Sequence, residues 1–277
     1  MVETARKVNI FYGTVLRGAC ADELKKSMLI QIYEIQTPDE ARMMVDLGVD
    51  HIGSVLVRDR DWKNPVLESA IRLVQEAGRK SSLIPLFGEI DRIAEAVAYY
   101  RPNILHFCET LVTAEVGGEA VNRILDRQAV LRKRFPEIEL MRSIPIGNDG
   151  GGDGIPSLEL AAMFEPISDW FLTDTLISGG NTVSDQDQPV QGYIGITGKT
   201  CNWEVARALV RQSRIPVILA GGIGPDNVVE GICRIHPAGV DSCTLTNRVD
   251  CSGRTIRFQK DPARVKKMID AVRGLEG

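Results

Sequence analysis

The sequence predicts a single α/β domain, a closed (β/α)8 TIM barrel, on two observations. From residue 28 to the end of the chain, short β-rich runs alternate with helical stretches, and eight such pairs follow one another. This alternation is typical of a parallel sheet covered by helices. The strand runs are apolar throughout, as expected for strands buried on both faces.

The chain length fits one barrel together with a short additional segment at the N-terminus. The 277 residues fit one barrel of roughly 250 residues. We therefore divide the chain into an N-terminal extension over residues 1–27 and a barrel over residues 28–277. An open, doubly wound sheet is the alternative arrangement of the same elements.

The first four strands are expected over residues 28–35, 51–57, 81–87 and 104–109. The helix after the first strand begins at Thr37, because a threonine N-cap followed by proline and then Glu40 forms a capping box. Gly48 ends this helix, since glycine readily adopts the left-handed conformation at a helix C-terminus. Asn64 and Pro65 open the next helix, and further helices follow the third and fourth strands.

The second half repeats the plan, with strands expected over residues 139–146, 169–175, 215–223 and 239–247. Helices are expected to begin at Ser157, after Asn202, at Pro225 and after Asp261. Pro225 is expected at the first helical position, where proline's missing N–H costs nothing.

Composition excludes several classes of function. The net charge of −4 argues against nucleic acid or an anionic membrane as the main partner. No apolar run reaches the length of about 18 residues that a membrane span needs. The six cysteines form no CxxC pair and the three histidines have no ligand spacing, so we expect reduced thiols, a cytoplasmic protein and no metal.

Glycines gather where the expected strands end, and these ends form the active face of such a barrel. Gly221 and Gly222 close the seventh strand just before a helix begins. Glycine lets backbone N–H groups approach an anion, and a helix start adds a partial positive charge. The pattern favours phosphate binding, with a phosphorylated sugar or inorganic phosphate as the partner. The alternative is that these glycines only form tight turns.

Several motifs resemble those of the phosphoribosylanthranilate isomerase family. Residues 215–228, IPVILAGGIGPDNV, are similar to its PVILAGGL-x-P-x-NV signature. Weaker similarities, in the same order along the chain, are FLTDT for LLDT at residues 171–175, GITG for GGTG at 195–198, GVD at 239–241 and LH at 105–106. The resemblance runs from about residue 29 to 275. It implies a barrel that needs no cofactor.

The resemblance also implies an activity, an Amadori isomerisation of an N-linked phosphoribosyl amine in tryptophan biosynthesis. Its general acid would be Asp174, the aspartate of the LLDT-like motif. The family's base is a cysteine at the end of the first strand, where this chain has Tyr33. Tyrosine titrates near pH 10, so it is a poor base unless its pKa is lowered. Glu34 is better matched to accept a proton, but strand alternation points it away from the barrel axis if Tyr33 points inward.

The resemblance further implies where the substrate binds. The residues expected to hold the phosphate are Gly198, Gly221, Gly222 and Thr244. Thr244 stands where the family has glycine, and it could donate through its hydroxyl and backbone N–H. Thr197 and His106 are expected at the rest of the substrate. Arg60 is expected to hold a substrate carboxylate, or else to belong to a solvated cluster of surface charges.

Three functions remain open on these grounds. The first is an isomerase of the phosphoribosylanthranilate type. The second is a different phosphosugar enzyme on the same scaffold, such as an epimerase or an aldolase, which the missing cysteine favours. The third is a barrel that binds phosphate without catalysis. A homo-oligomer is compatible with each of them.

Overall fold

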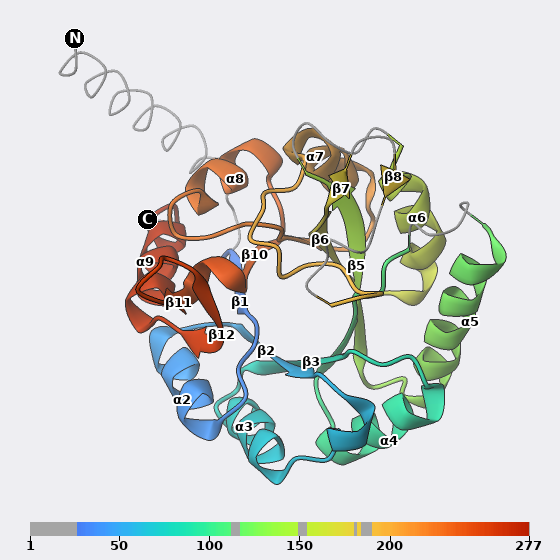
Figure 1. The fold of residues 1–277 in the computed structure, drawn as a ribbon, viewed down its shortest axis with the longest axis horizontal. Coiled ribbons are helices and arrows are strands. Elements are labelled where there is room, and N and C mark those ends of the chain that lie inside the picture. Colours follow the sequence, from blue (N-terminus) through green and yellow to red (C-terminus); the bar gives the residue numbers. More distant parts are fainter. Residues whose placement is uncertain (1–26, 112–116, 149–153, 180–181, 184–189, 277) are drawn as a thin grey trace.

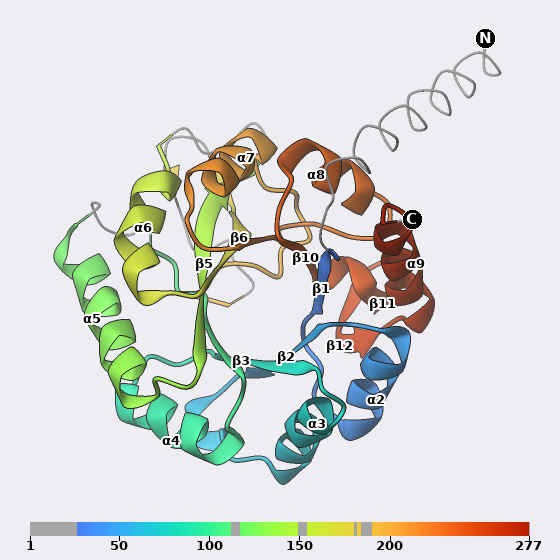
Figure 2. The ribbon, with the colours of Figure 1, turned by 180° about the vertical axis from the view of Figure 1, so that it is seen from behind.

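The computed structural model describes residues 27–111, 117–148, 154–179, 182–183 and 190–276. In this part of the chain, eight parallel strands close into a barrel in the order β1, β10, β9, β6, β5, β4, β3, β2. Helices surround the ring of strands on all sides (Figure 1, Figure 2). The predicted (β/α)8 barrel is confirmed. The predicted N-terminal extension lies, up to residue 26, outside the described residues.

The barrel strands are β1 (Leu29–Ile32), β2 (His51–Leu56), β3 (Lys80–Pro85), β4 (Ile104–Phe107), β5 (Glu139–Gly147), β6 (Trp170–Leu176), β9 (Val217–Leu219) and β10 (Gly239–Ser242). The helices around them are α2 (Pro38–Leu47), α3 (Pro65–Glu76), α4 (Ile90–Tyr100), α5 (Glu119–Arg134), α6 (Ser157–Phe164), α7 (Trp203–Gln212), α8 (Val228–Ile235) and α9 (Pro262–Arg273). A short β7–β8 pair (Ser178–Gly179, Thr182–Val183) follows β6. None of the helices in the described part of the chain is long and apolar enough to cross a membrane.

The predicted helix starts rest on local chemistry that the structure reproduces. The Thr37 side chain accepts a hydrogen bond from the backbone N–H of Glu40, and the Glu40 carboxylate accepts one from the N–H of Thr37, which completes the capping box of α2. Asn64, Asn202 and Asp261 cap α3, α7 and α9 in the same way, each through its side-chain oxygen.

Helix α8 begins later than predicted, at Val228. Pro225 lies in the turn before it. The side chain of Asn227 explains the delay, because its Oδ1 accepts from the backbone N–H of Gly224 at 2.9 Å and its Nδ2 donates to the carbonyl oxygen of Gly222 at 2.8 Å. These two bonds hold residues 222–227 in a turn, so the helix starts only after it.

The eighth strand is also shorter than predicted, because β10 ends at Ser242. A 3₁₀ turn, η4 (Thr244–Thr246), follows it, and then an antiparallel hairpin of β11 (Asn247–Val249) and β12 (Thr255–Lys260). Buried Lys260 fixes the base of this hairpin, since its Nζ donates to the Cys243 carbonyl oxygen at 2.7 Å and to Asn247 Oδ1 at 2.6 Å. Local sequence patterns do not reveal these contacts, and the hairpin was not predicted.

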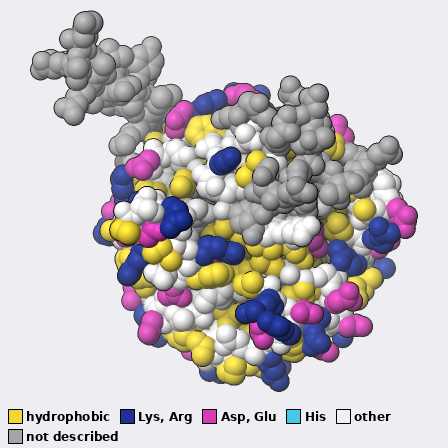
Figure 3. Space-filling view, viewed as in Figure 1, with side chains coloured by type: hydrophobic (Ala, Val, Ile, Leu, Met, Phe, Trp, Pro, Cys, Tyr) yellow, Lys and Arg dark blue, Asp and Glu magenta, His cyan; other side chains and the backbone are white. Residues whose placement is uncertain are grey.

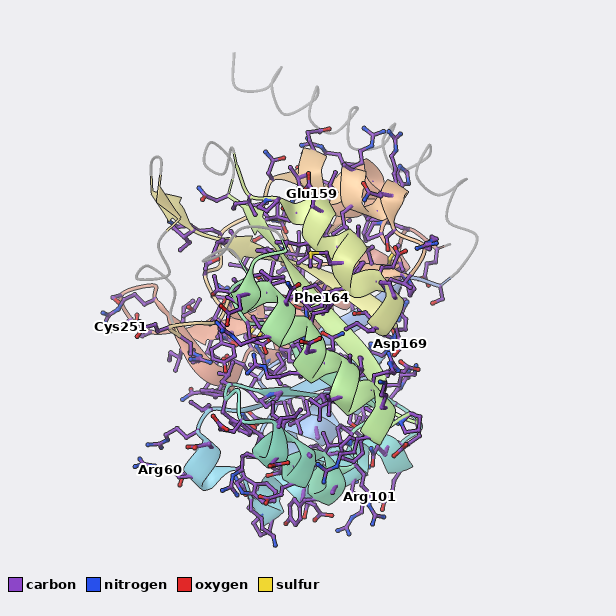
Figure 4. All side chains as sticks on the ribbon, turned by 90° about the vertical axis from the view of Figure 1, so that its right-hand side faces the viewer. Arg60, Arg101, Glu159, Phe164, Asp169 and Cys251 are labelled. Atoms are coloured by element: carbon purple, nitrogen blue, oxygen red, sulfur yellow. The ribbon has the colours of Figure 1, made fainter. Side chains whose placement is uncertain are left out.

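The two ends of the barrel are distinct. Arg60, which follows β2, and Cys251, in the turn of the β11–β12 hairpin, lie at one end, whereas Arg101 and Asp169 lie at the other (Figure 4). The first end therefore carries the C-terminal ends of the strands. Figure 3 shows that face, with hydrophobic side chains gathered near its middle. Active sites of such barrels lie at this end.

Candidate active site

A cavity opens at the C-terminal ends of the strands. Its wall comes from residues at or just after the ends of β1, β2, β3, β4, β6, β9 and β10 and from the loop over residues 193–198. The wall is mostly apolar and contains three carboxyl groups, those of Glu34, Asp174 and Asp241.

Asp174 projects from β6 into this cavity. Burial raises the pKa of its carboxyl from the usual 3.8 to about 7, although the backbone N–H of Thr175 donates to Oδ1 at 2.8 Å and lowers it. At neutral pH the group can therefore hold a proton and also release it. Gly195, with φ +100°, passes so close that a Cβ there would lie 2.3 Å from Asp174 Oδ2. The glycine allows the loop to cover the carboxyl group.

Gly221 and Gly222 form a close turn beside Asp174, and both have positive φ, +81° and +63°. A Cβ on Gly221 would lie 2.4 Å from Thr175 Oγ1, and one on Gly222 would lie 2.4 Å from the backbone carbon of Lys199. Tight packing alone thus requires glycine here, whether or not an anion binds. The structure still brings the residues predicted to bind phosphate to one cavity wall, where the two glycines are joined by Gly198 and Thr244, with Thr197 beside them.

Tyr33 is buried in the cavity wall, and its ring lies against Gly53, where a Cβ would be 2.1 Å from the ring. Its hydroxyl hydrogen-bonds to Ser82 Oγ and to His106 Nδ1, both at 2.6 Å. Burial raises the pKa of Tyr33 well above its usual 10. The expectation that Tyr33 acts as the base therefore has no support from its surroundings.

His106, predicted at the substrate, also lines the cavity. Its second ring nitrogen, Nε2, lies 2.8 Å from Ser143 Oγ. Burial, with the nearby Arg142 guanidinium, lowers the pKa of His106 to about 3. The imidazole is thus neutral, and both of its nitrogens are engaged by Tyr33 and Ser143, so it orients the tyrosine ring.

Glu34 lines the same cavity as Tyr33, which corrects the expectation from strand alternation. Strand β1 ends at Ile32, and Glu34 has φ +66°, a left-handed conformation. The alternation of side chains stops where the strand stops. Glu34 is only 1% exposed, and its Oε1 accepts from Arg257 Nε at 2.6 Å. Arg257, on β12, neutralises this carboxylate.

Arg60 is the one predicted site residue that the structure keeps away from the cavity. Its side chain is 71% exposed, lies 3.6 Å from Asp61, and belongs to the short turn η1 (Asp59–Asp61). It points outward from the barrel (Figure 4). This placement agrees with a solvated cluster of surface charges. Among the described residues, the wall of the cavity contains no lysine or arginine side chain.

Asp241 is the cavity residue that sequence reasoning missed. It lies on β10 directly opposite Gln31 of β1, and it is 6% exposed. Burial, together with the nearby carboxyl of Asp174, raises the pKa of its carboxyl to about 8, although a hydrogen bond with Gln31 lowers it. Its Oδ1 is buried without a hydrogen-bond partner. A charged residue in a strand that was predicted to be buried on both faces was the signal that could have found it.

Comparison with known proteins identifies relatives in both sequence and structure. N-(5'-phosphoribosyl)anthranilate isomerase from Methanocella arvoryzae is 32% identical over 253 residues, covering 88% of this chain and 97% of that protein. The crystal structure of phosphoribosyl anthranilate isomerase from Thermus thermophilus matches with a TM-score of 0.60 at 16% identity, covering 90% of this chain and 100% of that one. A phosphoribosyl anthranilate isomerase in complex with reduced 1-(o-carboxyphenylamino)-1-deoxyribulose 5-phosphate matches with a TM-score of 0.55 at 16% identity, covering 89% of this chain and 99% of that one. No protein-family model matches the chain.

Proposed function

Because the chain belongs to the phosphoribosylanthranilate isomerase family, we propose that it isomerises N-(5'-phosphoribosyl)anthranilate to the corresponding aminodeoxyribulose phosphate, a step of tryptophan biosynthesis. One observation carries the proposal: a single cavity holds both a carboxyl group that titrates near neutral pH, that of Asp174, and the close glycine turn of residues 221–222. The first suits proton transfer to a sugar, and the second suits its phosphate.

Asp174 supplies the first proton. The reaction begins when the furanose ring oxygen takes a proton, the C1–O bond breaks, and the nitrogen lone pair forms a C1=N bond. A carboxyl group with an ordinary pKa would be ionised at pH 7 and could not donate. The raised pKa of Asp174, about 7, keeps a large fraction protonated there.

We assign the phosphate to the neighbouring part of the wall, formed by the backbone of Gly198, Gly221 and Gly222 and by Thr244. Gly221 packs on Thr175, the residue next to Asp174. A phosphoribosyl group anchored at this turn is therefore held with its sugar ring near the proton donor, which is how fixed geometry accelerates a unimolecular step.

The test is turnover of phosphoribosylanthranilate by the purified protein and by two variants. Asp174→Asn keeps the shape and removes the proton, so kcat/KM should fall by about 10²-fold or more. Asp270→Asn is the matched control, because Asp270 lies on α9 and pairs with Lys266 at the surface. Asp174→Asn turning over as fast as the parent would contradict the proposed role.

One observation favours a second candidate, an isomerase of the same chemistry whose substrate lacks the anthranilate carboxylate. In the described part of the chain, no cationic side chain lines the cavity, and Arg60 lies outside it. The same assay distinguishes the two with N-(5'-phosphoribosyl)aniline, which has no carboxylate. A higher kcat/KM for the aniline compound would favour the second candidate. Phosphate binding with turnover of neither would leave the epimerase, the aldolase or the non-catalytic barrel.

A further inference from the structure

We propose that Asp241 is the group that accepts the C2 proton during the isomerisation, working across the cavity from Asp174. This inference rests on the proposed function, which leaves the proton acceptor unassigned. Three features of the structure carry it: the position of Asp241 in the barrel, its unpartnered oxygen, and the engagement of the neighbouring groups. The proton balance of the reaction supports it as well.

The position follows from the strand order. Strands β6, β9 and β10 are consecutive neighbours in the barrel, so Asp174 on β6 and Asp241 on β10 stand on either side of β9. Strand β9 leads directly into the glycine turn at Gly221 and Gly222. All four residues line the one cavity. A sugar phosphate anchored at the turn would therefore have one carboxyl group on each side.

One carboxyl oxygen of Asp241 has no hydrogen-bond partner. Its side chain is 6% exposed, Gln31 is its side-chain hydrogen-bond partner, and Oδ1 has none. Buried polar atoms are nearly always satisfied, and an exception calls for a role. Asp241 lines the cavity, and we infer that the role of its carboxyl group is to take a proton from a bound substrate.

The other ionisable groups nearby are engaged. The hydroxyl of Tyr33 is held between Ser82 and His106. The carboxylate of Glu34 is paired with Arg257. Burial raises the pKa of the Cys243 thiol far above neutral, so it is not a thiolate.

The proton balance of the reaction requires two groups. Asp174 gives a proton to the ring oxygen, and the ring opens to a C1=N iminium. Asp241 then takes the proton from C2, the C2–H electron pair forms the C1=C2 bond, and the C1=N electrons return to nitrogen. The resulting enaminol gains a proton at C1 and loses its C2 hydroxyl proton, which gives the ketone. The proton that Asp241 gains equals the one that Asp174 loses, and exchange with solvent restores both groups.

Several charged or titratable groups face Asp241 and set when it can act. The facing groups are Tyr33 after β1, Asp174 on β6, Cys243 after β10 and Lys260 on β12. Two carboxyl groups in one cavity oppose each other's ionisation, so at neutral pH they tend to hold one proton between them. The reaction needs that one proton on Asp174 and none on Asp241. Because the pKa of Asp241, about 8, is higher than that of Asp174, about 7, this arrangement is the minor form of the singly protonated pair, and kcat/KM should follow a bell-shaped pH profile.

The test compares the parent with Asp241→Asn, Asp241→Ala and the surface control Asp270→Asn. For Asp241→Asn we expect kcat to fall by about 10²-fold or more and the acidic limb of the pH profile to disappear, because the group that must ionise is gone. Inorganic phosphate, measured by calorimetry, should bind both Asp241 variants as it binds the parent. Added formate should partly restore turnover in Asp241→Ala, since it can take the vacated carboxylate position.

The outcomes separate this inference from the function that it rests on. A parent that does not turn over either phosphoribosyl amine overturns the proposed function and the inference with it. An active parent whose Asp241→Asn variant keeps its rate and both limbs overturns the inference alone. An Asp241→Ala protein that binds phosphate but gains nothing from formate overturns it too. Loss of phosphate binding and early melting in both Asp241 variants would make Asp241 a structural residue and would also overturn it.

Discussion

Tyr33 is buried and Asp174 half-buried in the wall of the cavity, and loss of contact with water raises the pKa of each. For the phenol this shift moves titration away from neutral pH, whereas for the carboxyl group it moves titration toward it. The same physical effect therefore argues against Tyr33 as the base and favours Asp174 as a group that transfers protons at neutral pH. Sequence reasoning found Asp174 from its motif but passed over Asp241, because the surroundings that raise the pKa of that carboxyl come from strands that meet only in the closed barrel.

The raised pKa of Asp241 predicts a dependence of stability on pH. A carboxyl group whose pKa rises from 3.8 unfolded to about 8 folded holds its proton more tightly in the folded state. Its contribution is therefore fully present below the unfolded pKa and is lost as the pH rises toward 8, by at most about 1.4 kcal/mol per pH unit. Asp241→Asn should remove this loss. As the pH rises from 5 to 8, the free energy of unfolding of the variant should therefore increase relative to that of the parent.

Urea unfolding of both proteins at several pH values measures the difference. Asp270→Asn should keep the parent's dependence, because its carboxyl group is exposed and paired at the surface. Parallel curves for the parent and Asp241→Asn would mean that this carboxyl is not held protonated by the fold.

At the scale of elements, the helix starts were predicted well and the last strand was not. Thr37, Asn64, Asn202 and Asp261 cap their helices through atoms only two or three residues away, which a linear sequence displays. The late start of α8 and the β11–β12 hairpin depend on side-chain contacts such as that of Lys260 with the Cys243 carbonyl oxygen. Such contacts are tertiary, and the pattern of hydrophobic residues does not encode them.

The glycine turn after β9 offers a prediction with a matched control. In Gly222→Asp, the new side chain meets the backbone of Lys199 and adds a negative charge, so we expect inorganic phosphate binding to be lost. Gly253 has a similar φ, +83°, but a Cβ there has nothing within 4 Å. Gly253→Asp should therefore carry the same backbone cost, about 1–2 kcal/mol, and still bind phosphate. Calorimetry on both variants decides, and unchanged binding in Gly222→Asp would place the phosphate elsewhere.

For the whole molecule, the eight repeated strand–helix pairs were enough to predict the barrel, because the repeat is visible in the sequence. The repeat alone did not predict which side chains meet in the site. Closure pairs β1 with β10 and so sets Gln31 beside Asp241, and it gathers the glycine turn and Asp174 around one cavity. The position of Arg60 shows the limit of the resemblance, since a residue in the expected loop points away from that cavity.

The most direct test of the central claim is to identify the product by NMR after the parent acts on phosphoribosylanthranilate labelled with ¹³C at C1. Isomerisation converts C1 from an anomeric carbon, bonded to both oxygen and nitrogen, into a CH₂ carbon bonded to nitrogen alone. We predict that the anomeric signal is replaced by the CH₂ signal with the parent and persists with Asp174→Asn. An anomeric signal that persists with the parent, while phosphate still binds in the cavity, would contradict the account.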